Sequence, residues 1–257
     1  MTTSREHIRL FIDAPLAHGA QIALPREQAH YLRNVMRRSA GDVLGLFNGR
    51  DGEWRAAIVE LGKQTCRAEV SEQIQVQSIV PDLWLLCAPV KRTRLEIIAE
   101  KAAELGVREF HLVITEYTNA QRVNIERLGA IMIEAAEQCG LVSVPIVQAP
   151  QKLHAVLDAW PSDRQILFCD ESGAGSAVLA RLRAQPHGRP WAVLIGPEGG
   201  FSPAERARLH AMPQCLAVSL GPRILRADTA AIAALALWQS VCGDWDTGPV
   251  ALAVQPV

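Results

Sequence analysis

The stretch that most restricts how this chain can fold is residues 191–205, where an apolar run meets a glycine-rich turn and a helix start. Residues 191–195 are all apolar, as a strand covered on both faces requires. Residues 196–200 form a Gly-Pro-Glu-Gly-Gly turn, and Ser202 and Glu205 then have the spacing of a capping box. This arrangement brings backbone amides against a ligand at the carboxyl end of a sheet, although a plain tight turn is the alternative.

The glycine spacing of that turn narrows the ligand class. It matches neither the dinucleotide fingerprint nor the phosphate loop of nucleoside triphosphate enzymes. We therefore expect a ligand other than a dinucleotide or a triphosphate.

Strand-like and helical segments alternate through the rest of the C-terminal two thirds. The apolar run at 83–90 precedes a helical pattern that ends at Gly106. Further strands are expected at 109–115, 144–147, 165–169 and 215–220, and further helices at 124–139 and 230–241. The alternation predicts an α/β domain with a mainly parallel sheet.

The N-terminal part has a different pattern. An extended stretch at 8–12 precedes a helix opened by Pro25, and residues 43–47 and 54–59 flank a turn-rich loop, as in a β-hairpin. With a strand at 65–70 this makes a small β-rich unit. Residues 71–81 are polar and end in proline, so we divide the chain into domains 1–75 and 76–246 and a tail 247–257.

The distribution of charge and the spacing of cysteines and histidines limit the kinds of binding site and the cellular location that we expect. The net charge is −1, but the first 38 residues carry six arginines against three acids, which fits either a solvated helix face or an RNA-binding surface. Six scattered cysteines without a C-x-x-C pair, and histidines without H-E-x-x-H, suggest neither a disulfide framework nor a metal site. With no signal peptide or membrane-length apolar run, we expect a cytoplasmic protein that does not bind membranes.

A second glycine-containing loop lies at residues 221–229, between the strand at 215–220 and an alanine-rich helix. Arg223 and Arg226 stand just before that helix. Arginine in such a place is often a surface ion pair, but next to a glycine turn and a buried helix we favour a ligand or substrate role.

At these two loops the chain resembles a known family. "LIGPEGGFSPAE" at 194–205 and "LGPRILRADTA" at 220–230 are similar to the signature loops of the RsmE family of 16S ribosomal RNA uracil-N3 methyltransferases, in the SPOUT superfamily. "LEIIAEKAAELGV" at 95–107, "EAAEQCG" at 134–140 and "HYLRNVMRRSAGD" at 30–42 extend the resemblance over nearly the full chain.

Three departures from the family's pattern stand out. Ala227-Asp228 replaces the usual Thr-Glu, Leu141 stands where Arg is usual, and residues 115–118 replace a Ser-Glu-Arg-Cys-like stretch. Asp228 keeps a carboxylate with shorter reach, and the missing arginine removes an RNA or structural contact. Neither the change at 227–228 nor the one at 141 alters the two glycine turns.

The resemblance implies a parallel sheet with a C-terminal trefoil knot, preceded by a PUA-like β-barrel. It implies a homodimer that uses S-adenosylmethionine to methylate N3 of a uridine in 16S rRNA of the small ribosomal subunit, with no metal. The cofactor would be held by Leu194, Gly196, Pro197, Gly199, Gly200, Leu220, Gly221, Ile224, Leu225 and Thr229. A methyltransferase acting on another RNA or position, or a non-catalytic RNA-binding assembly factor, are the alternatives.

The chemistry assigns roles within this set. Loss of the uracil imide proton builds charge on the flanking carbonyl oxygens, which a fixed guanidinium can stabilise, so we assign that role to Arg226 and then Arg223. Glu198 and Asp228 are the nearest carboxylates, and the sequence does not choose the general base between them. RNA phosphates are expected to contact Arg9, Arg33, Arg37, Arg38, Lys91 and Arg92. The sequence encodes neither the target nucleotide nor the ribosomal particle legibly.

Overall fold

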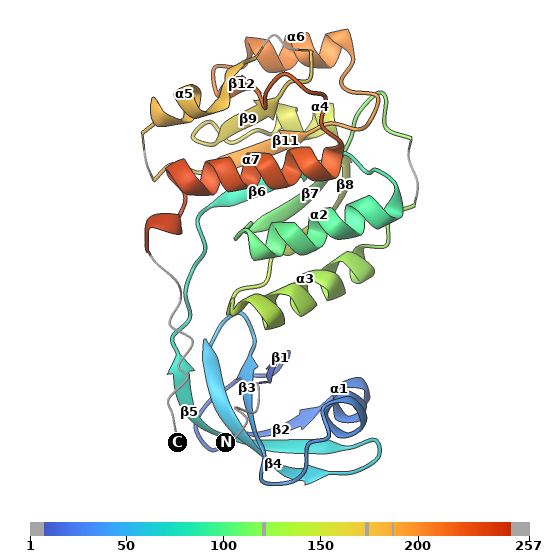
Figure 1. Ribbon diagram of the computed structural model, residues 1–257, viewed down its shortest axis with the longest axis vertical. Coiled ribbons are helices and arrows are strands. Elements are labelled where there is room, and N and C mark those ends of the chain that lie inside the picture. Colours follow the sequence, from blue (N-terminus) through green and yellow to red (C-terminus); the bar gives the residue numbers. More distant parts are fainter. Residues whose placement is uncertain (1–7, 120–121, 173–174, 187, 248–257) are drawn as a thin grey trace. The chain divides into compact units, whose positions relative to one another are not determined.

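The computed structural model describes residues 8–119, 122–172, 175–186 and 188–247 (Figure 1). Contacts divide the chain into two compact units. Of the described residues, the first unit holds 8–79 together with Ala136–Ser143, and the second holds Val80–Ala135 and those from 144 to 247. The predicted domain division at 75/76 did not foresee that a short segment from the middle of the chain belongs to the N-terminal unit.

The first unit is built on a five-stranded sheet, as far as the described residues go, in the order β1-β3-β4-β5-β2. Its elements are β1 (Arg9–Phe11), β2 (Gln21–Leu24), α1 (Arg26–His30), the π-helical turn η1 (Tyr31–Val35), β3 (Val43–Phe47), β4 (Glu53–Leu61) and β5 (Cys66–Gln75). The strands β3, β4, β5 and β2 pair antiparallel, and β1 joins β3 in parallel. The predicted hairpin of residues 43–47 and 54–59 is thus confirmed.

One element of this unit is longer than expected. We predicted this strand only to residue 70 and placed the domain boundary within the polar residues 71–81, but β5 continues to Gln75 because that end pairs with Glu53 of β4. Backbone pairing with an existing strand outweighs the weak strand propensity of polar side chains.

The second unit contains a seven-stranded sheet in the described residues, in the order β10-β12-β9-β11-β6-β7-β8, and its recorded pairs are all parallel. Its strands are β6 (Leu83–Cys87), β7 (Glu109–Ile114), β8 (Ile146–Lys152), β9 (Gln165–Cys169), β10 (Ser176–Ala177), β11 (Trp191–Ile195) and β12 (Cys215–Ser219). Its helices are α2 (Arg92–Glu104), α3 (Ile125–Cys139), α4 (Leu153–Asp158), α5 (Val178–Arg183), α6 (Pro203–Ala211), α7 (Ala227–Cys242) and the 3-10 turn η2 (Trp245–Thr247). The predicted parallel α/β fold is confirmed.

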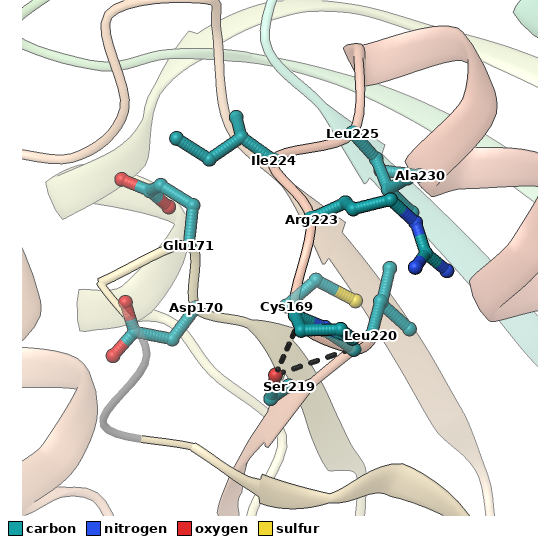
Figure 2. A pocket seen from close by; sticks show the side chains of 11 residues that line it. Cys169, Asp170, Glu171, Ser219, Leu220, Arg223, Ile224, Leu225 and Ala230 are labelled. Carbon is teal, nitrogen blue, oxygen red and sulfur yellow. Dashed lines mark hydrogen bonds between the residues drawn. The ribbon is translucent and has the colours of Figure 1, made fainter.

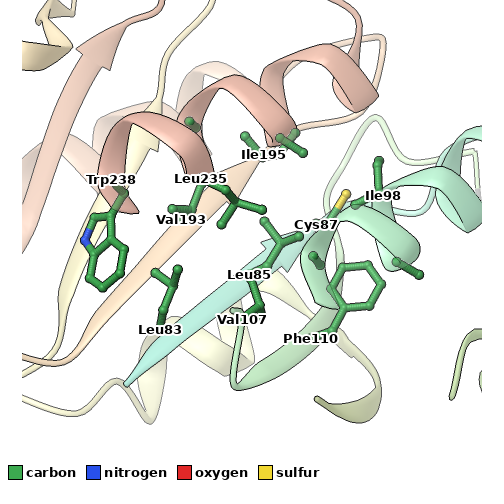
Figure 3. Packing of buried hydrophobic residues seen from close by; sticks show 14 of the residues in the cluster. Leu83, Leu85, Cys87, Ile98, Val107, Phe110, Val193, Ile195, Leu235 and Trp238 are labelled. Atoms are coloured by element: carbon green, nitrogen blue, oxygen red, sulfur yellow. The ribbon is translucent and has the colours of Figure 1, made fainter. Parts of the chain in front are cut away.

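The inner strands β6, β9 and β11 are largely buried on both faces of the sheet, and their side chains alternate between the two faces. Leu85 and Val193 belong to a cluster that includes residues of α2 and α7 (Figure 3), whereas the next residues, Leu86 and Leu194, belong to a cluster with α4 and α6. A strand with helices on both faces needs apolar residues at successive positions, not alternate ones. This is why the central strands read as unbroken apolar runs.

The helix α7 begins three residues earlier than predicted. It starts at Ala227, with Arg226 as its N-cap, so Asp228 and Thr229 lie in its first turn instead of in a loop. Ala227 and Ala231 are buried on the inner face, and that packing extends the helix beyond the alanine-rich core on which the prediction was based. The trefoil knot implied by the resemblance stays a prediction.

In the described part of the chain, no helix is long and apolar enough to cross a membrane. The same residues contain no group of three or more His, Cys, Asp or Glu side chains arranged to hold a metal ion.

Candidate functional site

A cavity of about 400 Å³ opens at the carboxyl ends of β9 and β12 (Figure 2). These two strands are neighbours in the sheet, so the turns that follow them face each other. Ligands of open α/β sheets bind at this edge. The lining residues are Cys169, Asp170, Glu171, Ser219, Leu220, Gly221, Pro222, Arg223, Ile224, Leu225 and Ala230.

The cavity wall combines apolar and charged groups. Leu220, Leu225 and Ala230 make one side apolar, and Figure 2 shows the carboxylates of Asp170 and Glu171 on the opposite side. The loop after β12 is held locally, because the Ser219 hydroxyl exchanges hydrogen bonds of 3.3 Å with the N–H and the carbonyl of Gly221. Ile224 is 88% exposed, an unusual state for a large apolar side chain beside a cavity.

The glycine turn that follows β11 lies next to this cavity without lining it. Gly200 has a φ of +69°, and a side chain there would overlap the carboxylate of Glu171. A Cβ at Gly196 would come within 2.6 Å of the Phe201 ring. Gly200 therefore suits both its positive φ and its contact with the cavity wall, and Gly196 leaves room for the Phe201 ring.

The start of α6 fixes this turn. The predicted capping box is present: the Ser202 hydroxyl accepts from the Glu205 N–H at 3.3 Å, and the Glu205 carboxylate accepts from the Ser202 N–H at 2.9 Å. The second Glu205 oxygen accepts from the Glu116 N–H at 2.9 Å, in the loop after β7. Glu198 reaches Arg94 at the start of α2, at 3.5 Å.

Arg206 links the same turn to β9. Its Nε donates to the Phe201 carbonyl at 3.0 Å, its Nη1 donates to Asp170 at 2.8 Å, and its Nη2 contacts Glu171. Burial of the Asp170 carboxylate acts to raise its pKa, but hydrogen bonds from Ser172 and His210 and the charge of Arg206 outweigh this, so the pKa is lowered. Asp170 therefore stays ionised in the fold.

The structure brings together part of the predicted cofactor set. Leu220, Gly221, Ile224 and Leu225 line the cavity. The other six do not line it: Leu194 is buried within β11, Gly196, Pro197, Gly199 and Gly200 form the neighbouring turn, and Thr229 is exposed in the first turn of α7.

Two of the predicted catalytic residues, Arg223 and Arg226, belong to the loop after β12, and the third, Glu198, lies in the turn after β11. Arg223 lines the cavity, and Arg226 is exposed three residues further on, at the N-cap of α7. Glu198 is exposed and paired with Arg94. Asp228 has a buried Oδ1 without a hydrogen-bond partner among the described residues, in the first turn of α7.

The predicted RNA-binding side chains divide by exposure. Arg33 and Arg37 are exposed beside the π-helical turn of the first unit, where Arg37 has a φ of +52°, and Arg38 is half-buried. In the second unit, Lys91 and Arg92 are exposed at the start of α2.

Arg9 differs from the other predicted RNA-binding residues because it is only 7% exposed. Its guanidinium pairs with Glu53 at 2.8 Å and donates to the carbonyls of Ala136, Glu137 and Leu141. A guanidinium committed to these acceptors is not available to phosphate, so we leave Arg9 out of the proposed RNA contacts.

Sequence reasoning missed the β9 side of the cavity. Cys169, Asp170 and Glu171 line it, and none was among the predicted site residues. The signal was present, because an acidic pair follows directly after the correctly predicted strand 165–169, at the carboxyl end where ligands bind. Arg206 was missed for a different reason: only the folded chain shows which acids it meets.

Comparison with known proteins identifies the class that this fold and site define. Residues 77–239 match the RNA methyltransferase domain family, and residues 24–71 match the RNA methyltransferase PUA domain. The protein is thus an α/β RNA methyltransferase with an N-terminal PUA domain. More narrowly, the chain belongs to the ribosomal RNA small subunit methyltransferase E family, since it is 32% identical over 229 residues to the member from Rickettsia conorii, covering 89% of this chain and 93% of the relative.

Two solved structures are similar over most of the chain. A ribosomal RNA small subunit methyltransferase E from Neisseria gonorrhoeae, bound to S-adenosylmethionine, has a TM-score of 0.84 and 28% identity, covering 93% of this chain and 100% of that one. A methyltransferase from Legionella pneumophila, solved with bound S-adenosylmethionine, has a TM-score of 0.83 and 29% identity, covering 93% and 99%.

Proposed function

We propose that this protein transfers the methyl group of S-adenosylmethionine to N3 of a uridine in 16S ribosomal RNA of the small subunit. The observation that carries the proposal is the cavity at the ends of β9 and β12, whose wall includes residues 219–225. The family membership of the chain gives the reaction class, and the names of its relatives supply the small-subunit rRNA as substrate. The uracil N3 position rests on the resemblance of the two loops.

The residues of the cavity fit this cofactor. A volume of about 400 Å³ is within the range of small-molecule sites. Apolar side chains of Leu220, Leu225 and Ala230 suit an adenine ring, and the part-exposed carboxylate of Glu171 suits a ligand with positive charges. S-adenosylmethionine carries both kinds of group, with a sulfonium and an ammonium beside its adenosine.

When bound, the cofactor supplies an electrophilic methyl group on sulfur. Uracil N3 forms the new bond to carbon as the sulfur–carbon bond breaks, and the N3 proton passes to a base. The protein has to align the nucleotide and stabilise the charge that develops on the two carbonyl oxygens of uracil. Arg226, exposed at the N-cap of α7, is assigned this second role, with Arg223 of the cavity wall supporting it.

The proton acceptor is assigned between two carboxylates. Glu198 is exposed and paired with Arg94, whereas Asp228 has an oxygen buried without a partner among the described residues. Glu198→Gln and Asp228→Asn distinguish them. The variant that removes the proton acceptor is expected to lose the increase of kcat with rising pH. The other variant is expected to keep the wild-type dependence of kcat on pH.

RNA is proposed to contact Arg33, Arg37, Arg38, Lys91 and Arg92. Phosphate contacts make binding weaken as salt rises, so each Arg→Gln change reduces the salt dependence. The homodimer is proposed from the resemblance, and light scattering can check it. A protein acting on ribosomal RNA is proposed to work in the cytoplasm.

The test is methyl transfer from labelled S-adenosylmethionine to small ribosomal subunits taken from a strain lacking this modification, followed by digestion to nucleosides. The expected product is 3-methyluridine. Label in another nucleoside would contradict the N3 assignment, and cofactor binding without transfer would favour another RNA or an assembly role. Failure to bind S-adenosylmethionine would overturn the proposal.

The arginine assignment has its own test. Arg226→Ala is expected to lower kcat by about 10²–10³-fold, as removal of a charge-stabilising donor does, while cofactor affinity and the dimer persist. Arg208→Ala is the matched control, because Arg208 of α6 pairs with Asp158 of α4 at 2.6 Å and does not line the cavity. Wild-type turnover in Arg226→Ala would remove Arg226 from the mechanism.

A further inference from the structure

Arg206 stands out among the arginines of the second unit because it touches three groups around the cofactor cavity and lines none of it. Its side chain is 24% exposed. Through Phe201 it holds the end of the glycine turn, and through Asp170 and Glu171 it holds the turn after β9. A planar guanidinium can hold several acceptors in fixed directions at once, which a lysine cannot do.

The two acids that Arg206 meets are in different states. The Asp170 side chain is fully buried and also accepts from the Ser172 N–H at 2.9 Å and from His210 at 3.1 Å. Asp170 is therefore satisfied within the protein and serves as an anchor. Glu171 is 35% exposed and lines the cavity, and its recorded hydrogen bonds, from Arg206 and from the Phe201 N–H, both go to Oε1.

The charges of this group do not cancel. One guanidinium faces two carboxylates, and because Asp170 is enclosed, the remaining negative charge lies at Glu171 on the cavity wall. A carboxylate in that place favours a cation next to it, and Figure 2 shows the guanidinium of Arg223, the arginine that lines this cavity, directed away from Glu171. Electrostatic attraction is stronger in such a partly enclosed site than in water.

We infer that Arg206 is a positioning residue that holds the Glu171 carboxylate on the cavity wall, where it favours the positively charged cofactor S-adenosylmethionine over its product. The inference rests on the proposed function. Methyl transfer removes the sulfonium charge, so S-adenosylhomocysteine enters the same cavity with one positive charge fewer. The group thus contributes to the preference for substrate over product.

The same helix provides a matched control. Arg208 lies two residues after Arg206 on α6 and binds one carboxylate, that of Asp158 at 2.6 Å, and one carbonyl, that of His154 at 3.3 Å. Both of its partners belong to α4, and none of the three lines the cavity. Arg208→Met removes the same kind of interaction from the same helix.

The experiment is calorimetric titration of the full-length protein with S-adenosylmethionine and with S-adenosylhomocysteine. Arg206→Met is expected to weaken S-adenosylmethionine binding on the order of tenfold and the product much less, and Arg206→Lys recovers part of the loss. Glu171→Gln lowers the same substrate-to-product preference. Once Arg206 is replaced, Glu171→Gln adds little, because the carboxylate is no longer held.

The outcomes separate the two claims. Wild-type binding with an unchanged preference in Arg206→Met, or full additivity of the two substitutions, overturns the positioning role and leaves the proposed function intact. Equal weakening by Arg208→Met also overturns it, since the effect then belongs to α6 in general. If the wild-type protein binds neither compound, the proposed function fails as well. Thermal unfolding of each variant identifies loss of the fold, and Arg206→Lys then carries the test.

Discussion

The two units each contain an arginine that binds acids and backbone carbonyls, but the two clusters differ in how far they are closed. In the first unit, Arg9 and Glu53 have side chains only 5% and 3% exposed, and Arg9 also lies 4.7 Å from the centre of the Phe47 ring. In the second unit, Arg206 is 24% exposed and one of its acids faces a cavity.

The difference teaches how burial separates a structural role from a functional one. Arg9 donates its hydrogen bonds to Glu53 and to three backbone carbonyls at the end of α3 and just beyond it. It therefore stabilises one arrangement of the chain. Carbonyls at a helix C-terminus have no partners within the helix and favour a cation. The Arg206 cluster instead leaves a charge at a surface that a ligand can reach.

The largest expected effect tests the closed cluster. Arg9→Met removes the guanidinium that pairs with the buried Glu53, and removing one partner of a buried pair costs about 3–5 kcal/mol. Urea unfolding is expected to show a loss of this size in the free energy of unfolding. Arg50→Met is the control, because Arg50 and Asp13 are 57% and 83% exposed and such pairs contribute about 0–1 kcal/mol.

A double variant sharpens this result. Arg9→Met with Glu53→Gln removes the buried charge as well, so part of the lost stability is expected to return. Equal stabilities of Arg9→Met and Arg50→Met would contradict a structural role for Arg9 and restore it as a candidate for RNA binding.

The next effect concerns acid stability of the open cluster. The pKa of Asp170 is lowered in the fold from the usual 3.8, so its ionised form contributes stability above that value. This contribution is lost as pH falls through the folded pKa. Asp170→Asn is expected to reduce stability at neutral pH and to flatten its fall below about pH 4, measured by denaturant unfolding at several pH values. An unchanged slope would show that Asp170 does not gain its ionised state from the cluster.

The smallest effect compares thiol reactivity in the two regions. Cys139, at the end of α3, is exposed, whereas burial raises the pKa of Cys169 on the cavity wall to about 12. Because the thiolate is the reactive form, Cys139 is expected to react first with an aromatic disulfide reagent at neutral pH. Cys139→Ser removes this fast phase. A fast phase that persists would mean that one of the half-buried thiols, Cys169, Cys215 or Cys242, reacts first instead.

Much of the fold followed from local pattern. The strands at 165–169 and 191–195 were predicted with the bounds observed for β9 and β11, because unbroken apolar runs of that length fit a strand covered on both faces. The Ser202 capping box and the helix stop at Gly106 were also foreseen, since each depends on residues a few positions apart. The end of β5 was not, because its pairing with β4 determines it.

Only one side of the cavity was predicted from the sequence. The loop at 220–225 was foreseen from its glycine and arginines, and it lines the cavity. Asp170 and Glu171 were missed, and Arg9 was expected on the surface. The sequence around an arginine is the same whether its side chain lies in water, pairs with a distant carboxylate or binds the end of a helix, so the sequence did not predict the burial of Arg9.

The sequence by itself determined the class of fold, the two glycine turns and the start of α6, because hydrophobic period, turn chemistry and capping act over a few residues. Only the tertiary structure decided that β12 lies beside β9, which brings the turns after these strands to one cavity. It also decided that Arg9 is buried and that Arg206 meets two acids more than thirty residues away. Burial and charge pairing depend on which distant segments meet, and strand order in a parallel sheet is not encoded in any single strand.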